Sequence, residues 1–154
     1  MIFYEGHSLF LQYKYQINID GTVAAYRLPY LLAGDGVVFK QDSEYYEHFY
    51  DRLKPWVHYI PLKHDLSDLE QKLKWAADHD KDAKEISRNA QKFTWENLLP
   101  HHIICYHGLL FEEYSKLLTS KPTESVLQDM ELVQEPNDPC HCMRQSTGAK
   151  HNEL

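Results

Sequence analysis

A change in the spacing of apolar residues between positions 15 and 39 constrains the fold most strongly. Residues 15–19 alternate apolar and polar side chains, which is typical of a short β-strand. After a turn at residues 20–22, residues 23–30 carry apolar side chains at helical spacing, and residues 37–39 form an apolar run suited to a buried strand. Strand, helix and strand in this order predict an α/β fold with a parallel sheet, which binds ligands at the carboxyl ends of its strands.

The boundaries of these elements follow from proline and glycine. Pro29 lies inside the first helical pattern and predicts a kink or an early end, and residues 34–36 (Gly-Asp-Gly) predict the stop. The aromatic-rich residues 44–53 are expected to be helical. Residues 57–62 are expected to be extended, because they follow Pro55 and are rich in apolar side chains.

Three more helices are predicted before a polar tail. Two of them begin with a capping box, in which a glutamate follows the capping residue three positions later: Ser67 with Glu70, and Asp82 with Glu85. A third apolar stripe lies within residues 103–117. Residues 121–154 are polar and interrupted by prolines, so we expect them to be a mobile tail.

Net charge argues against nucleic-acid binding, and the distribution of apolar residues argues against a membrane-spanning helix. The chain of 154 residues has 23 acidic and 16 basic residues and a formal charge of -7, a sign that does not attract the phosphate backbone of nucleic acids. No apolar run approaches the roughly 20 residues that a membrane-spanning helix needs. Residues 1–13 lack a basic start and a small-residue cleavage site, so they make a poor signal peptide.

One segment has the chemistry of a phosphate site. A predicted strand runs into the turn at Gly21, and a predicted helix of small residues starts at once. Backbone N–H groups at a helix N-terminus favour an anion, and Arg27, one turn later, could bind a diphosphate through both arms of its guanidinium. Ala24 and Ala25 leave room for a ligand near the backbone. The alternative is an ordinary strand-to-helix turn with a solvated arginine.

Two other groups of residues have a functional and a structural interpretation. In residues 53–61, Trp56 or His58 could line a pocket, or the segment could be a core strand with a hydrogen-bonded histidine. The second group is His101, His102, Cys105 and His107. His101 and Cys105 lie four residues apart and would share a helix face, a spacing found in metal sites, but a complete set of four ligands is not evident. A half-buried thiol among surface histidines is the simpler explanation.

Four motifs, in this order, resemble the CAP10-type glycosyltransferase domain: YQINIDGTVAAYRLPY at 15–30, KQDS at 40–43, YYEHFY at 45–50 and PWVHYIP at 55–61. They are most similar to the KDEL-motif-containing protein O-glucosyltransferases. The chain ends in His151-Asn152-Glu153-Leu154, which is similar to the KDEL-type luminal retention signal.

This resemblance implies the Rossmann-like nucleotide-sugar-binding lobe of a GT-B-type enzyme. It implies inverting transfer of glucose from UDP-glucose to serines of EGF-like repeats in the endoplasmic reticulum lumen, without a required metal; UDP-xylose stays open as the donor. The implied partners are the UDP-sugar, EGF-repeat-containing secretory proteins and the KDEL-type retrieval receptor. The stretch that matches the family's donor site gives the expected binding residues: Gly21, Thr22, Val23, Ala24, Ala25, Tyr26 and Arg27.

The resemblance also implies what the chain lacks. The family's general base is an aspartate of the N-terminal lobe, and no part of this sequence matches that lobe. We therefore name no catalytic residue and expect residues 14–120 to be a donor-binding half that is inactive alone, preceded by a non-family segment at 1–13. The family's cysteine partner for Cys105 lies in the missing part as well. The alternative function is a non-catalytic luminal fragment that holds UDP or a partner protein.

Overall fold

The computed structural model describes residues 12–119, which fall into two units, Met1–Leu99 and Pro100–Leu154. Each unit is treated separately below. The predicted tail at 121–154, its retention-like tetrapeptide and most of the segment 1–13 lie outside the described residues.

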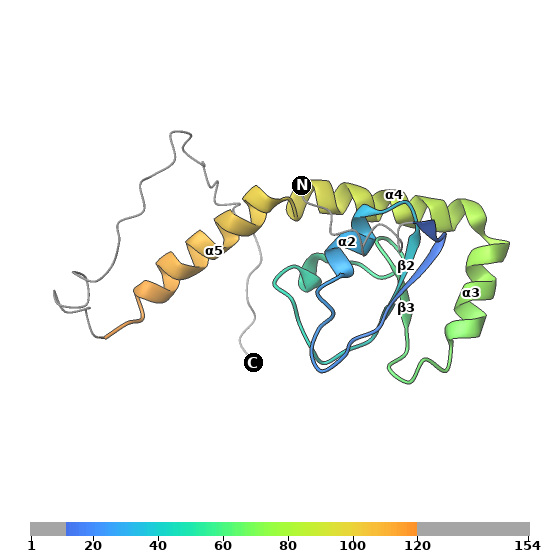
Figure 1. Ribbon diagram of the computed structural model, residues 1–154, viewed down its shortest axis with the longest axis horizontal. Coiled ribbons are helices and arrows are strands. Elements are labelled where there is room, and N and C mark those ends of the chain that lie inside the picture. The colour runs from blue at the N-terminus through green and yellow to red at the C-terminus, as the bar shows by residue number, and fades with distance from the viewer. Residues whose placement is uncertain (1–11, 120–154) are drawn as a thin grey trace. The chain divides into compact units, whose positions relative to one another are not determined.

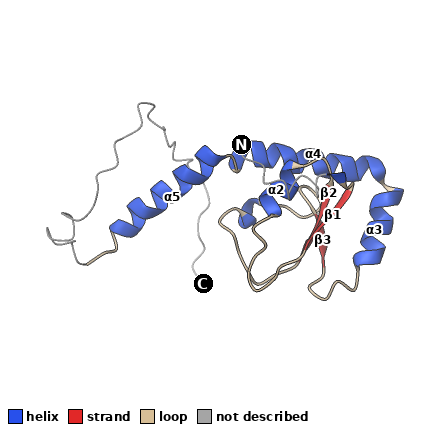
Figure 2. Cartoon of the chain, in the orientation of Figure 1, coloured by secondary structure: helices blue, strands red, loops and turns tan. Residues whose placement is uncertain are grey.

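A small parallel sheet organises the first unit. Its three strands, β1 (Tyr15–Asn18), β2 (Val37–Gln41) and β3 (Ile60–Leu62), lie in the order β1-β2-β3 and are all parallel. Ile17 is the partner of Phe39 in the register between β1 and β2. The strands are short relative to the helices and loops around them (Figure 2). The predicted α/β fold with a parallel sheet is therefore confirmed.

The two faces of the sheet support separate cores. On one face, Val38 belongs to the same apolar cluster as α2 (Leu28–Ala33). On the other face, Phe39 belongs to a cluster with residues of α3 (Leu69–Asp78). Because successive residues of a strand point to opposite faces, Lys40 lies on the same face as Val38.

The long helix α4 (Asp80–Asn97) lies at the amino end of the sheet. The Ser87 hydroxyl donates to the Asp35 carbonyl at 2.9 Å, directly before β2, and Lys14, directly before β1, forms an ion pair of 2.6 Å with Asp80. Figure 1 shows α4 crossing this end of the strands. The loops that follow β1 and β2 are consequently at the opposite, carboxyl end.

Gly36 permits the close approach of the chain before β2 to the chain before β1. A Cβ atom at this position would lie 2.6 Å from the Tyr13 carbonyl oxygen and 2.7 Å from the Gln16 side-chain nitrogen. Any larger residue would force these backbones apart. The predicted glycine stop is confirmed as well, since Gly34 is the C-cap of α2.

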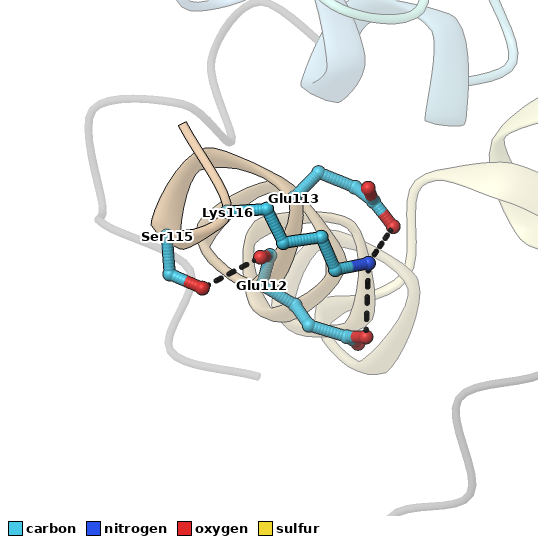
Figure 3. A network of polar contacts seen from close by, with 4 residues as sticks. All are labelled: Glu112, Glu113, Ser115 and Lys116. Atoms are coloured by element: carbon cyan, nitrogen blue, oxygen red, sulfur yellow. Dashed lines mark hydrogen bonds and ion pairs between the residues drawn. The ribbon is translucent and has the colours of Figure 1, made fainter. Parts of the chain in front are cut away.

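The second unit contributes one described helix, α5 (Pro100–Ser115), which coincides with the predicted third stripe. None of its residues is buried. At its end, Lys116 forms ion pairs with Glu113 at 2.9 Å and Glu112 at 3.6 Å, and the Ser115 hydroxyl donates to the Glu112 carbonyl (Figure 3). These contacts hold the last turn of α5 together.

The first helix starts later than predicted. The spacing of Val23 and Tyr26 predicts a helix from residue 23, but α2 begins at Leu28 and Pro29 stands in its first turn. A proline is favoured there because its missing N–H has no helical acceptor and its φ angle is already helical. Pro29 therefore begins the helix and does not kink it.

The predicted helix at 44–53 is wrong: only a 3-10 turn at Tyr50–Arg52 forms. The side chains of Phe49 and Tyr50 are both buried in the core beside Val38. The loop is thus held by two adjacent aromatic anchors, which a regular helix would point in different directions.

Both predicted capping boxes are displaced. Asp68 and His79 are the N-caps of α3 and α4, and neither makes a side-chain capping hydrogen bond. The Asp68 carboxylate instead accepts the Lys63 backbone N–H at 3.0 Å. The helices themselves are present, because their apolar faces pack on the two cores.

Candidate functional site

The loop after β1 is fastened to its neighbours by Asp20. The Asp20 carboxylate accepts the backbone N–H of Ala25 at 2.9 Å, which closes the loop on itself. The Asp20 N–H donates to the side-chain oxygen of Gln41 at 3.1 Å, and the Gln41 amide nitrogen donates to the His64 carbonyl at 2.6 Å. The last residue of β2 therefore joins the segments that follow β1 and β3 at the carboxyl end of the sheet.

The same loop presents positive charge and backbone donors. The Arg27 guanidinium donates to the Ile19 carbonyl across the loop and is half-buried. Thr22 and Val23 are exposed, and within residues 12–119 no acceptor pairs with their N–H groups or with that of Ala24. An arginine that carries further N–H donors beside unpaired backbone N–H groups can bind an anion such as a phosphate.

The predicted basis for this anion site needs correction. Residues 21–23 are not a helix N-terminus, because α2 starts at Leu28. Ala25 is buried at 6% exposure and so gives a ligand no access to its backbone, and Gly21 has no positive φ angle. Any anion affinity of this loop must come from the N–H groups of residues 22–24 and from Arg27.

A second group of polar residues lies at the same end of the sheet, on the face of Val38. A cavity of about 90 Å³ is lined there by side chains from the end of β2 and the following loops, among them Lys40, Asp42, Ser43, Tyr46, Tyr50 and Tyr59. The Lys40 ammonium lies 4.6 Å from the centre of the Tyr50 ring and 5.9 Å from that of Tyr59.

Residues 40–43 entered the prediction only through family resemblance. A lysine directly after a buried apolar run is the signal that could have found this site.

Burial governs the acid–base properties of this cavity. It lowers the pKa of Lys40, an effect opposed by the nearby carboxylates of Asp20 and Asp42. Burial likewise raises the pKa of the Tyr50 and Tyr59 hydroxyls. Both tyrosines are therefore neutral hydroxyls at physiological pH, able to donate and to accept hydrogen bonds.

The segment at 55–58 forms a turn where the prediction allowed a core strand. Trp56 has a φ angle of 63°, and its ring is half-exposed and lies 4.8 Å from that of Trp75. His58 accepts the Lys54 N–H at Nδ1 over 3.1 Å and contacts the Phe93 ring. The interpretation of His58 as a hydrogen-bonded histidine is confirmed.

The histidines and Cys105 do not form a metal centre in the described part of the chain. The Nε2 atoms of His101 and His102 lie 3.1 Å apart. No three His, Cys, Asp or Glu residues within 12–119, however, are arranged to hold a metal ion. Cys105 is half-buried, as expected, but it is disulfide-bonded and so is not a thiol.

Comparison with known proteins identifies the family. The profile of glycosyl transferase family 90 matches residues 6–151. The chain belongs to this family. The match includes part of the segment predicted to be non-family and most of the tail.

Several named relatives of this family 90 chain are O-glucosyltransferases. It is 57% identical to protein O-glucosyltransferase 2 of Danio rerio and 50% identical to protein O-glucosyltransferase 3 of Homo sapiens, each over 88% of this chain and 27% of the relative. It is 41% identical to O-glucosyltransferase rumi of Drosophila pseudoobscura pseudoobscura over 70% of this chain and 27% of that protein. The chain thus spans about a quarter of these relatives' length.

Within the described residues, no helix has the length and apolar character needed to cross a bilayer.

Proposed function

We propose that this chain is the donor-binding part of a protein O-glucosyltransferase. In this proposal it forms a Rossmann-like lobe of a GT-B-type enzyme that holds UDP-glucose for inverting transfer to serines of EGF-like repeats. The observation that supports it best is the loop at 19–27, which carries Arg27 and the N–H groups of residues 22–24 and lies at the carboxyl end of a parallel sheet. The names of the relatives support transfer of glucose to protein.

The chemistry of the reaction assigns the chain a binding role. Transfer to a serine needs a base that accepts the hydroxyl proton, and the resemblance assigns that base to the other lobe. Residues 19–27 instead supply what a leaving diphosphate needs: a guanidinium and backbone N–H donors that offset its negative charge. We also propose that the protein acts in the endoplasmic reticulum lumen, without a metal, and that His151 to Leu154 are read by the KDEL-type receptor.

Isothermal titration calorimetry with UDP and UDP-glucose tests this function on the purified chain. We expect both nucleotides to bind and ADP to bind more weakly, since a uridine-specific donor site should discriminate the base. Equal binding of ADP and UDP would reduce the site to a general phosphate loop. Absence of binding by either uridine nucleotide at millimolar concentration would refute the proposal.

A further inference from the structure

Outside the loop at residues 19–27, called the donor loop from here on, Lys40 stands out because it is a buried cation that forms no ion pair with any described residue. It is the last-but-one residue of the central strand β2, and the residue is only 8% exposed. Within residues 12–119, no carboxylate lies within ion-pair distance of its ammonium, whose one hydrogen bond, of 3.3 Å, goes to the Gln41 carbonyl. An ammonium can donate three hydrogen bonds, so most of this capacity is unused.

Within the described residues, three neighbours of this lysine carry buried polar atoms that have no partner. Asn18 is the residue opposite Lys40 in the β1–β2 register, and it is 1% exposed. Among the described residues, neither its side-chain oxygen nor its nitrogen has a hydrogen-bond partner, and the same holds for the Tyr50 hydroxyl and for Oδ2 of Asp20. Tyr50 is also one of the residues that line the cavity. Buried polar groups are nearly always hydrogen-bonded, so these unpaired atoms indicate a place for a ligand.

The residues that line the cavity fit a sugar better than a phosphate. Asp42 lines it, and Asp20 is close enough to raise the pKa of Lys40. The Asp42 carboxylate in the lining disfavours a phosphate group in this cavity, because like charges repel. A sugar hydroxyl, in contrast, both donates and accepts hydrogen bonds, so it can satisfy carboxylate, ammonium and tyrosine hydroxyl together, and the rings of Tyr50 and Tyr59 suit the apolar faces of a sugar.

We propose that Lys40, Asp42 and Tyr50 form a hydroxyl-binding subsite that receives a sugar of the nucleotide donor. This inference rests on the proposed function, and it places sugar recognition on the face of Val38 while the diphosphate binds the loop at 19–27. The sugar hydroxyls come from the ribose or from the hexose, and the two sources are distinguished by the ligands used below. Lys40 and Tyr50 are binding residues in this arrangement, and neither takes part in proton transfer.

The test compares the affinities of Lys40→Met and Tyr50→Phe for UDP-glucose and UDP by titration calorimetry. Each variant should bind UDP-glucose about tenfold more weakly, because a hydrogen bond to the sugar is lost. If the hexose occupies the subsite, UDP affinity is unchanged; if the ribose does, both ligands lose affinity equally. Lys72→Met is the matched control: Lys72 also lies over an aromatic ring, that of Trp56 at 4.3 Å, and its loss should not change either affinity.

Thermal unfolding separates binding from folding. Tyr50→Phe removes a buried hydroxyl that has no described partner, so the ligand-free variant should melt at the same temperature as the parent or higher, although it binds UDP-glucose more weakly. Unchanged UDP-glucose affinity in both variants, while Arg27→Ala loses affinity, would overturn the subsite and leave the donor loop intact. A parent chain that binds no uridine nucleotide would overturn both proposals.

Discussion

Arg27 has two roles in the donor loop: it holds the loop together by a hydrogen bond, and it supplies positive charge. Its guanidinium crosses the loop to the Ile19 carbonyl, and it adds positive charge to the loop that carries the N–H groups of residues 22–24. A lysine could supply the charge, but it lacks the planar fork that binds two phosphate oxygens at once. The identity of this residue, and not only its charge, should therefore matter for a diphosphate.

We predict that Arg27→Ala weakens UDP binding by about tenfold to a hundredfold, because charge-assisted hydrogen bonds contribute roughly 1.5–3 kcal/mol. Arg27→Lys should recover only part of this loss. Titration calorimetry with UDP measures both, and Arg52→Ala, at an exposed position outside the loop, is the control. If Arg27→Ala bound UDP as the parent does, Arg27 would be a structural tether of the loop and the diphosphate would have to bind elsewhere.

Single residues of the site differ in how far sequence could predict them. The position of Arg27 in the loop after β1 was predictable, because the strand before it is visible in the alternation of residues 15–19, whereas its binding role stays a prediction. Asn18 and Lys40 become neighbours only through the register between β1 and β2, a tertiary relation that local patterns do not contain. The rule that polar residues at strand ends face a ligand could suggest each of them, but it does not show that they meet.

At the scale of elements, buried strands and amphipathic helices were predictable and their starting points were not. The apolar faces of α3 and α4 pack on cores, so their spacing in the sequence is enforced by packing. The starting point of a helix depends on which backbone N–H group binds the polar side chain that precedes the helix. Asp68 binds the Lys63 N–H and so does not cap α3, a contact that needs the turn before the helix to be formed.

The turn before β3 contains a histidine whose protonation should weaken it. Burial, and secondarily the charge of Lys54, lowers the pKa of His58 below its ordinary value near 6.5, and Nδ1 accepts the Lys54 backbone N–H. Protonation at Nδ1 abolishes this acceptor. The unfolded chain therefore binds the proton more tightly, so the stability contributed by neutral His58 is present above about pH 6.5 and is lost as the pH falls through the folded-state pKa.

We predict that His58→Asn reduces the fall in stability between about pH 7 and pH 5, since an amide oxygen can accept the Lys54 N–H and does not titrate in this range. Urea unfolding at several pH values measures the slope. In the parent, NMR titration should give His58 a midpoint below the ordinary value, and Lys54→Met should move it upward because the neighbouring positive charge is gone. A midpoint at or above the ordinary value would contradict the burial argument.

At the scale of the whole molecule, the apolar burial of residues 12–119 is concentrated in the unit Met1–Leu99. Both core clusters are built from its strands and from α2, α3 and α4, and Phe39 at the centre of the sheet is 0% exposed. In α5, by contrast, no residue is buried, and Phe111 is 66% exposed. The three tryptophans, Trp56, Trp75 and Trp95, all belong to the first unit, so their fluorescence reports its unfolding selectively.

We predict that Phe39→Ala lowers the free energy of unfolding by about 3–5 kcal/mol, because it leaves a cavity between β1 and β3 and removes the edge-to-face contact with Tyr15. The matched substitution Phe111→Ala should change it by less than about 0.5 kcal/mol, since the ring is mostly solvent-exposed. Urea unfolding followed by tryptophan fluorescence compares the two on the complete chain, with circular dichroism as a check on helix content. Comparable losses would mean that the apolar side chains of α5 are buried in solution and that both units unfold as one cooperative body. Stability that depends on Phe39 and not on Phe111 would instead assign the cooperative unit to the sheet and its three packed helices, the same elements that position Lys40 and Arg27.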